Sequence, residues 1–383
     1  MRTHQWHSRW VEEKVYFRGE DYFRALIQDI EHARHSVSIE SYIFELDRAG
    51  RRLVRALRAA GRRGVKVRLM VDGLGNPGWS NRRTEWMEKL GIQVKVFGPA
   101  AWQQKRSALR NLLAILMGEP FRFKYMNRRN HRKVAIIDSK IGFVGGMNVS
   151  DDIFESYRGK RFWRDCMVKV RGSGIQVFES AFEAEWSDSV AERRKRLASI
   201  RPGAEPLAWV NSSRRLRRAH TAFWRRSLTA TEEKLWAVTP YFAPSLWLLR
   251  LLRRARDRGL DVRVLLPETS DVFFMDIING IFVGSLLRRG VRVFFFQKAI
   301  LHAKVFLTRD FAIVGSSNWT RRSFHLNLEA DVVVQSESSR KDLQYEILSA
   351  LGRSTEMTVE TWRKRRWIRR LFEAVLRRWI KWV

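Results

Sequence analysis

The chain has 383 residues, 45% of them hydrophobic, and its 73 Lys and Arg against 40 Asp and Glu give a formal net charge of +33. This composition excludes a disordered chain and predicts a globular protein with one large core or two of ordinary size. The single cysteine, Cys166, excludes an internal disulfide framework and a multi-cysteine metal site, and it fits a reducing compartment.

So large a positive charge favours polyanions or anionic surfaces as partners, which leaves nucleic acid and acidic lipid. The N-terminal residues MRTHQWHSRW lack the apolar core of a signal peptide. No apolar run reaches the roughly 18 residues expected of a membrane-spanning helix. We therefore expect a soluble or peripheral protein.

Two series of elements with the same order follow one another along the chain. Each contains a strand that ends at a tyrosine, a basic amphipathic helix with a glycine stop and an apolar strand, and then another strand after a glycine. The first series occupies 36–44, 51–73 and 90–97, and the second occupies 234–242, 247–268 and 289–296. The alternation predicts an α/β fold of two pseudo-symmetric α-β-α sandwich halves, packed with an active site at their interface.

We expect the first half to span 1–188 and the second 220–350, joined by a basic linker at 189–219. The first half carries an insertion between Phe97 and His131 that the second half lacks. This insertion is basic and partly apolar. We expect it to contact a membrane through Trp102, Leu112, Leu113 and Ile115, in addition to the C-terminal segment described below.

Each series ends in a nearly repeated segment: NHRKVAIIDSKIGFVGGMN at 130–148 and LHAKVFLTRDFAIVGSSN at 301–318. Residues two apart on a strand point to the same face, so each segment aims an imidazole and an ammonium at one spot. Small residues after the hairpin would let a ligand approach the backbone beside an asparagine. The residues concerned are His131, Lys133 and Asn148 in the first copy, and His302, Lys304 and Asn318 in the second.

Two histidines, two lysines and two asparagines facing one another suit a phosphodiester. Lysine and asparagine would stabilise the charge that develops on the non-bridging oxygens. One imidazole can attack phosphorus while the other protonates the leaving alkoxide, so neither a metal nor a cofactor is needed. Asp165 and Glu329, at matching places downstream, could orient the two imidazoles. A single His-x-Lys pair is usually without meaning, but two in equivalent places of a duplicated fold favour catalysis.

These segments resemble the phospholipase D superfamily. HRKVAIID fits its HxKxxxxD signature, with Asp138 in the aspartate position, and GGMN fits the continuation; HAKVFLTRD and GSSN resemble the second copy. The matches RSFHLNLEADV and ESYIFE are most similar to bacterial cardiolipin synthases without transmembrane helices. The resemblance covers about residues 15–345.

The second copy departs from the signature. It has Arg309 where the signature has aspartate, Asp310 follows one place late, and the hairpin is one turn residue shorter. Because the loss falls at the far tip, we expect it to affect hairpin stability rather than chemistry, with Asp310 as the substitute. The family's Asn-Leu-Asp is Asn318-Trp319-Thr320 here, which leaves the acceptor preference open.

The resemblance implies a covalent phosphatidyl-histidine intermediate and a ping-pong course. One phosphatidylglycerol would release glycerol, and the hydroxyl of a second would take the phosphatidyl group. In this superfamily the histidine of the first motif is usually the nucleophile, which implies His131 as nucleophile and His302 as the acid and then the base. The residues alone leave the two roles interchangeable. The resemblance also implies a peripheral protein on the cytoplasmic face of the bacterial inner membrane, and no obligate protein partner is inferred.

The last residues, 361–383, predict a basic amphipathic helix. Its apolar residues recur at three- and four-residue steps, and the rest includes nine Lys or Arg with one acid, Glu373. Such a helix should lie in the interface of an anionic bilayer, and the alternative is that it packs on the protein's own core. The residues expected to insert are Trp367, Phe372, Trp379 and Trp382.

Three other functions stay open. A phosphodiesterase acting on nucleic acid would suit the charge but not the amphipathic tail. A hydrolase or a phosphatidylserine synthase would use water or serine as acceptor. A non-enzymatic membrane scaffold would leave the paired motifs unexplained. Glu40, Tyr42 and Tyr241 either border the pocket or are ordinary strand-end residues.

Overall fold

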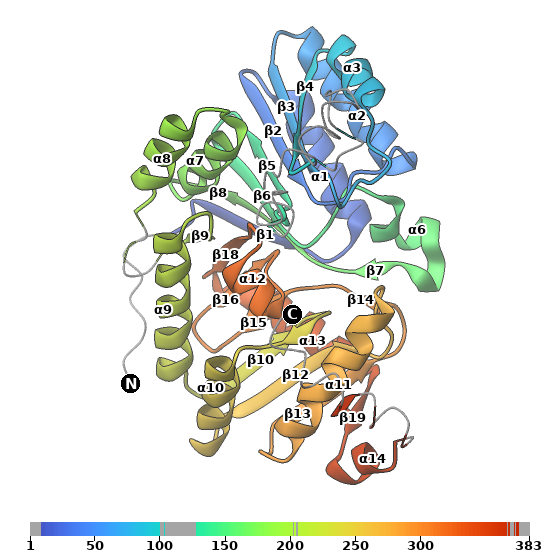
Figure 1. The fold of residues 1–383 in the computed structure, drawn as a ribbon, viewed down its shortest axis with the longest axis vertical. Helices are drawn as coiled ribbons and strands as arrows, with labels where there is room; N and C mark the ends of the chain where they lie inside the picture. Colours follow the sequence, from blue (N-terminus) through green and yellow to red (C-terminus); the bar gives the residue numbers. More distant parts are fainter. Residues whose placement is uncertain are drawn as a thin grey trace, which may run out of the picture.

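A computed structural model describes residues 9–99, 103, 128–201, 203, 206–365, 367, 371 and 373–374. Two mixed β-sheets dominate the structure, one in each half of the chain, with the first half above the second in Figure 1. The first has seven strands in the order β1-β8-β6-β5-β2-β3-β4, and the second has eight in the order β19-β13-β12-β10-β15-β16-β18-β9. Read in opposite directions the two orders correspond strand for strand, with β19 added at one edge. This duplication confirms the predicted α/β fold of two halves.

The first half begins at the chain's N-terminal strand and ends in two helices. Its strands are β1 (Glu12–Tyr16), β2 (Ser36–Ser41), β3 (Lys66–Asp72), β4 (Ile92–Phe97), β5 (Val134–Ile137), β6 (Ile141–Gly145), β7 (Trp163–Arg164) and β8 (Met167–Arg171). Its helices include α1 (Gly19–His32), α2 (Arg48–Arg62), α3 (Asn81–Lys89), α6 (Glu155–Arg158), α7 (Ile175–Trp186) and α8 (Val190–Ser199).

The second half starts inside the segment expected to be a linker, because β9 (Ala208–Val210) joins the second sheet beside β18. Its other strands are β10 (Lys234–Val238), β11 (Phe242–Ala243), β12 (Asp261–Pro267), β13 (Arg292–Phe296), β14 (Ile300–Leu301), β15 (Val305–Leu307), β16 (Ala312–Gly315), β17 (Trp319–Thr320), β18 (Ala330–Val334) and β19 (Ser354–Met357). Its helices are α9 (Arg214–Ala230), α10 (Leu246–Asp257), α11 (Phe273–Leu287), α12 (Arg321–His325), α13 (Glu337–Leu351) and α14 (Val359–Arg363).

The amphipathic pattern of the helices determines how they cover the sheets. In α2 the side chains of Leu53, Val54 and Leu57 are buried while the arginines between them face solvent. Asp47 caps the N-terminus of α2, and its carboxylate accepts a hydrogen bond from the Gly50 amide. The inner faces of both sheets share one core, to which Val134 and Val144 contribute from the first half and Val305 and Val314 from the second. The two halves therefore pack as one body.

In each half the strand that follows the His-Lys pair is central. β5 lies antiparallel between β2 and β6, and β15 lies antiparallel between β10 and β16. The parallel strands β2 and β3, like β10 and β12, are joined through helices. Both His-Lys pairs consequently emerge from the middle of a sheet, where buried neighbours on either side hold the backbone in place.

Candidate active site

The backbone on which each histidine lies is hydrogen-bonded to the other half of the molecule. The His131 amide donates to the Leu328 carbonyl at 2.9 Å, and the Leu328 amide donates to the Arg129 carbonyl at 2.8 Å. In the second half β14 pairs in parallel with β7, and the His302 amide donates to the Arg164 carbonyl at 2.9 Å. The halves thus exchange short strand pairings directly at the two motifs.

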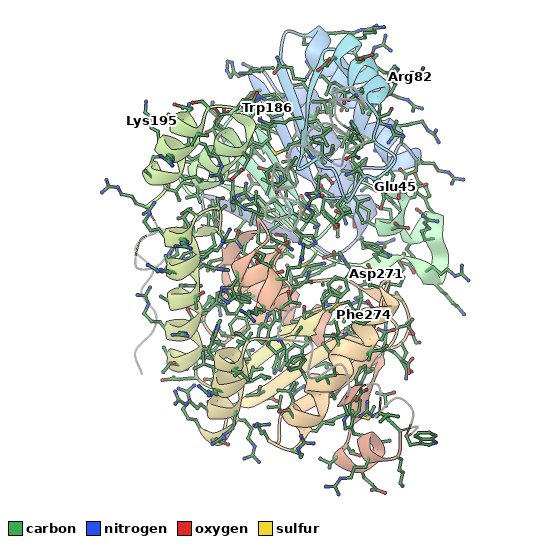
Figure 2. All side chains as sticks on the ribbon, viewed as in Figure 1. Glu45, Arg82, Trp186, Lys195, Asp271 and Phe274 are labelled. Atoms are coloured by element: carbon green, nitrogen blue, oxygen red, sulfur yellow. The ribbon has the colours of Figure 1, made fainter. Side chains whose placement is uncertain are left out.

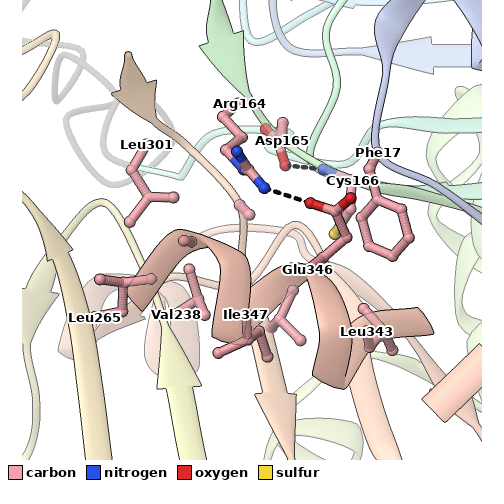
Figure 3. A pocket seen from close by; sticks show the side chains of 13 residues that line it. Phe17, Arg164, Asp165, Cys166, Val238, Leu265, Leu301, Leu343, Glu346 and Ile347 are labelled. Atoms are coloured by element: carbon pink, nitrogen blue, oxygen red, sulfur yellow. Dashed lines mark hydrogen bonds and ion pairs between the residues drawn. The ribbon is translucent and has the colours of Figure 1, made fainter. Parts of the chain in front are cut away.

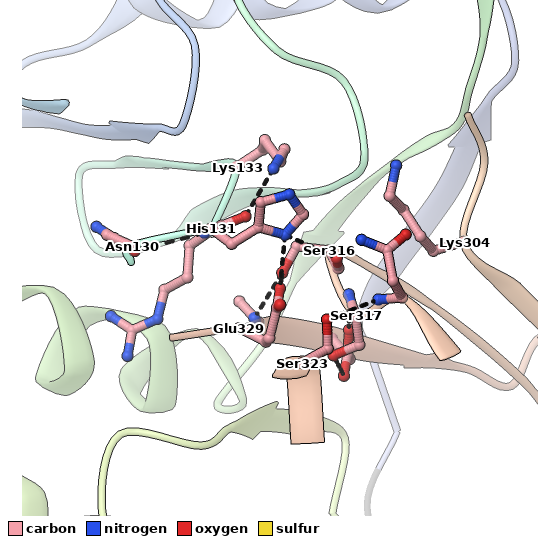
Figure 4. Close-up of polar contacts among 12 residues, drawn as sticks. Asn130, His131, Lys133, Lys304, Ser316, Ser317, Ser323 and Glu329 are labelled. Carbon is pink, nitrogen blue, oxygen red and sulfur yellow. Dashed lines mark hydrogen bonds and ion pairs between the residues drawn. The ribbon is translucent and has the colours of Figure 1, made fainter. Parts of the chain in front are cut away.

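This exchange gives each histidine a carboxylate partner from the opposite half. His131 Nδ1 lies 3.0 Å from Glu329 Oε2, and His302 Nδ1 lies 2.5 Å from Asp165 Oδ2. His131 Nδ1 also lies 3.1 Å from the Ser316 carbonyl, and Ser316 Oγ donates to Glu329 at 2.5 Å. Figure 4 shows this group around His131. Because a carboxylate holds Nδ1 of each ring, Nε2 is the atom of each imidazole that can react, and Lys304 Nζ lies 3.1 Å from His302 Nε2.

Both motif lysines are buried beside their histidines. Lys133 Nζ donates to the His131 carbonyl at 2.7 Å and lies 5.1 Å from the centre of the Tyr42 ring. Lys304 Nζ donates to the His302 carbonyl and lies 3.5 Å from Asp165 Oδ2. Two buried ammonium groups at one site make a region that favours an anion.

The two asparagines after the hairpins are both buried, but they differ in their bonding. Asn148 Oδ1 accepts a hydrogen bond from the Ile43 amide at 3.1 Å. The backbone amide of Asn318 donates to Ser323 Oγ at 3.2 Å. Among the described residues, Asn318 Oδ1 and Glu329 Oε1 are buried acceptors without a hydrogen-bond partner. Unpartnered buried acceptors are costly, so this site has capacity for a donor such as a hydroxyl group.

The tyrosines that follow β2 and β10 border the histidines. The ring centroids of Tyr42 and His131 are 5.0 Å apart, and those of Tyr241 and His302 are 6.4 Å apart. Tyr241 Oη donates to Asp271 Oδ2 at 2.7 Å. Glu40 lies deeper, where it accepts a hydrogen bond from Asn130 Nδ2 at 2.8 Å and pairs with the buried Arg132. Of the three residues left open by the sequence, the two tyrosines line the site and Glu40 supports the backbone behind His131.

Asp138 does not join the other motif residues. It lies five residues from Lys133 beyond the end of β5, roughly 16 Å away at about 3.3 Å per residue. Its carboxylate accepts hydrogen bonds from the amides of Arg34, His35 and Ser36 at 2.7–2.9 Å. The expectation that groups Asp138 with the catalytic residues is therefore corrected: this aspartate anchors the hairpin tip.

The second half anchors its hairpin tip with the opposite charge. Arg309 pairs with Glu233 at 2.9 Å and with Glu232 at 3.4 Å, on the segment that corresponds to 34–36. Asp310 accepts a hydrogen bond from Arg309 at 3.0 Å. The grouping of Asp310 with the catalytic residues is corrected likewise, and Arg309 rather than Asp310 replaces Asp138, because the two glutamates supply the complementary charge.

The glycines after the two hairpins have a different role from the ligand contact that the sequence predicts. A Cβ at Gly146 would lie 2.1 Å from Asp165 Oδ1, and one at Gly315 would lie 2.0 Å from Asp331 Oδ1. These glycines thus make room for the protein's own carboxylates instead of a ligand.

Thr320 stands where the family has aspartate. It accepts a hydrogen bond from the Ser323 amide at 3.2 Å and caps α12, a role that aspartate also performs well.

Two residues beside the motifs were not predicted, because no local pattern marks them. Trp163 packs on His302 with ring centroids 4.4 Å apart, and buried Asp72 accepts a hydrogen bond from the Asn130 amide at 2.8 Å. A small cavity of about 30 Å³ lies beside Asp165 and is lined mainly by apolar side chains of both halves, which Figure 3 shows. Little water can therefore compete for the hydrogen bond between Asp165 and His302.

Burial and the crowding of like charges control the ionisation of the site. Burial, and next the charge of Lys133, lower the pKa of His131 to about 4. Burial, and next the charge of Lys304, lower the pKa of Lys133 to about 7 and also lower the pKa of His302. Burial tends to raise the pKa of Glu329, but His131, Lys133 and Ser316 together outweigh burial, and the pKa of Glu329 lies below its ordinary value. A bound anion would oppose these shifts of the bases.

We expect the free energy of unfolding to fall as the pH drops from 6.5 to about 4. In this window the unfolded chain protonates His131 at its ordinary pKa of 6.5, whereas the folded protein does so only near 4. The unfolded state binds more protons, so stability rises with pH across the window. In His131→Gln the loss should be smaller by up to about 3 kcal/mol. Urea denaturation at several pH values measures this difference, and parallel curves for the two proteins would contradict it.

The C-terminal tail is described in part. Trp362 is buried and stacks on Phe295, and Trp367 is 68% exposed. None of the described helices is long and apolar enough to cross a bilayer. The remaining predicted membrane contacts lie outside the described residues, namely Phe372, Trp379 and Trp382 in the tail and Trp102, Leu112, Leu113 and Ile115 in the insertion.

Comparisons with known proteins identify the family. Residues 26–186 and 225–351 match a family described as "Cardiolipin synthase, PLD-like domain". A cardiolipin synthase from Clostridium perfringens (strain SM101 / Type A) is 30% identical over 95% of this chain and 75% of its own length. The chain belongs to the cardiolipin synthase family of phospholipase D-like proteins.

Other members of the cardiolipin synthase family align over nearly the whole chain. A cardiolipin synthase from Geobacillus sp. (strain WCH70) is 27% identical over 96% of this chain and 71% of its own length. The predicted resemblance and the predicted class of enzyme, a phosphatidyltransferase of the phospholipase D superfamily that acts on phospholipid, are thereby confirmed.

Solved structures support the fold. Phosphatidylserine synthase from Haemophilus influenzae Rd KW20 superposes with a TM-score of 0.70 at 11% identity, over 95% of this chain and 93% of that one. Polyphosphate kinase from Porphyromonas gingivalis has a TM-score of 0.57 at 12% identity, over 91% of this chain and 49% of that one. At such low identity these likenesses concern the fold alone.

Proposed function

We propose that the protein is a cardiolipin synthase that moves a phosphatidyl group from one phospholipid to the hydroxyl of phosphatidylglycerol. The observation that carries the proposal is the pair of histidines, each held at Nδ1 by a buried carboxylate from the opposite half. Two reactive Nε2 atoms and two buried ammonium groups suit an in-line displacement at an anionic phosphodiester. Family membership supports lipid as the substrate.

In the first step, His131 Nε2 attacks phosphorus and forms a P–N bond while the P–O bond to the leaving glycerol breaks. His302 donates its proton to the departing alkoxide. The negative phosphodiester opposes the lowering of the His302 pKa, so substrate binding helps this imidazole to hold that proton. Glu329 stabilises the positive charge on the His131 ring.

In the second step, the acceptor hydroxyl passes its proton to His302 Nε2 and its oxygen attacks phosphorus, which breaks the P–N bond and frees His131. Lys133 and Lys304 would balance the charge on the non-bridging oxygens, with Asn148 donating from its amide nitrogen. The unpartnered oxygens of Asn318 and Glu329 would accept hydrogen bonds from the hydroxyl groups of the second phosphatidylglycerol. The pseudo-symmetry also permits the reverse assignment of the histidines.

We further propose that the two halves, expected at 1–188 and 220–350 and with β9 added to the second, act as one catalytic body, and that the tail, 361–383, holds this body on the membrane. Its exposed Trp367 and its nine Lys or Arg support attachment to an anionic bilayer. In a bacterium this corresponds to the cytoplasmic face of the inner membrane.

The deciding experiment incubates the purified protein with phosphatidylglycerol vesicles and follows cardiolipin and glycerol by mass spectrometry. We expect equal amounts of the two products, and none from His131→Ala. Phosphatidic acid without cardiolipin would identify a hydrolase and overturn the proposal. If no lipid product forms, single-stranded DNA is the next substrate to assay, because the charge of +33 also suits a phosphate backbone.

A further inference from the structure

Helix α11 holds the tyrosine that borders His302. Asn279 Oδ1 accepts a hydrogen bond from the Phe242 amide at 2.7 Å, and its Nδ2 donates to the Pro240 carbonyl at 3.1 Å. Tyr241 lies between these two residues, and its hydroxyl is bound by Asp271 just before the helix. The position of α11 therefore determines the position of Tyr241 beside the site.

The same helix receives the start of the tail on two glycines. A Cβ at Gly280 would lie 2.3 Å from Glu373 Oε1, and one at Gly284 would lie 2.7 Å from Trp362 Nε1. Glu373 is paired with Arg365 at 2.7 Å, and the Arg365 guanidinium lies 3.0 Å from the centre of the Trp362 ring. The close approach requires residues without side chains at both positions, so the tail is fitted to α11.

Apolar side chains are exposed on both of these joined segments. Val272 and Phe274, at the N-terminal end of α11, are 43% and 46% exposed, and Trp367 and Leu371 in the tail are 68% and 56% exposed. Figure 2 shows Phe274 near Asp271, on the side of the second half that faces the first. Phe274 is six residues from Gly280, about 9 Å along the helix.

The charge of the tail indicates what covers these residues. Glu373 is the single acid of 361–383, and the other charged residues are all Lys or Arg. Glu373 itself is buried and paired with Arg365. Among the described residues of the tail, Arg363, Lys364, Trp367 and Leu371 are exposed. Exposed basic residues beside tryptophan and leucine are typical of a segment that lies in the interface of an anionic bilayer. The nearby carboxylates are engaged within the protein, Asp271 by Tyr241 and Asp276 by the Ser270 amide.

We propose that the N-terminal end of α11, with Val272 and Phe274, and the described part of the tail, with Trp367 and Leu371, form one docking surface for an anionic phospholipid bilayer. The inference rests on the proposed function, because lipid is the substrate. Insertion of Phe274 and Val272 would hold the Tyr241 and His302 side of the site at the lipid headgroups. Because the tail packs closely on α11 at Gly280, a tail bound to the membrane would hold that side of the site at a constant distance from the bilayer.

Flotation with phosphatidylglycerol vesicles tests the surface. Phe274→Ser should weaken partitioning of the full chain about tenfold, because a half-exposed phenylalanine no longer enters the bilayer. Leu348→Ser is the matched control, since Leu348 is 42% exposed on α13, and it should bind as the wild type does. Equal binding of the two variants would overturn the proposal.

Gly280→Ala tests the packing of the tail on α11, with Gly352→Ala as its control because a Cβ there meets other atoms only at 3.6 Å. In Gly280→Ala, cardiolipin formation on vesicles should fall severalfold while hydrolysis of a soluble phosphodiester is unchanged. A loss of both activities would mean that the glycine serves only the fold. If the wild type makes no cardiolipin, the proposed function fails, yet the comparison of vesicle binding still decides whether the surface exists.

Discussion

His131→Ala and His302→Ala should each lower cardiolipin formation by at least roughly a thousandfold. One imidazole carries the phosphatidyl group and the other transfers the proton, and neither can replace the other within one turnover. Both side chains are buried, yet they fill a polar site and not the apolar core, so the variants should remain folded. Mass spectrometry of cardiolipin and glycerol measures the loss, and circular dichroism checks the fold.

Asp138→Ala is the matched control for these variants, because it alters a residue of the same motif outside the site. It removes three hydrogen bonds to backbone amides and should cost about 1–3 kcal/mol of stability. Turnover per folded molecule should stay near that of the wild type. Near-normal activity in either histidine variant would rule out a mechanism with two histidines.

Glu329→Gln and Asp165→Asn should each lower kcat by roughly a hundredfold to ten-thousandfold. Each carboxylate holds Nδ1 of one histidine and stabilises its positive form from the opposite half. Glu183→Gln is the control, since Glu183 pairs with Arg68 away from the site and its loss should leave turnover unchanged.

The crossed pairing also predicts which histidine responds. Glu329 raises the pKa of His131, so Glu329→Gln should lower the pKa of His131 further and leave His302 nearly unchanged. Asp165→Asn should lower the pKa of His302 instead. Histidine titration by NMR separates the two cases, and a reversed response would show that the carboxylates are wrongly paired.

The α/β fold and its duplication were predictable because strand and helix periodicity depends on neighbouring residues. The order of elements from 36 to 97 returns from 234 to 296, and the two sheets correspond strand for strand. The linker was less predictable. Its basic composition concealed β9, since a strand of three residues at a sheet edge depends on its partner β18 more than on its own pattern.

The sequence by itself also determined the reactive groups. A repeated His-x-Lys followed by a small-residue turn and an asparagine indicated a phosphodiester site, because alternation along a strand fixes which side chains share a face. It likewise indicated the basic amphipathic tail, because helical spacing is local. Equivalent carboxylates were visible at Asp165 and Glu329, but the sequence could not assign each to a histidine.

Only the tertiary structure decided the pairings that join distant parts of the chain. Glu329 reaches His131 across 198 residues and Asp165 reaches His302 across 137, because the halves exchange strands at the motifs. Asp138 and Arg309 anchor equivalent hairpin tips with opposite charges, because Asp138 binds backbone amides such as that of His35 and Arg309 binds the carboxylate of Glu233. Such contacts depend on how two sheets pack, and no local pattern of residues encodes that arrangement.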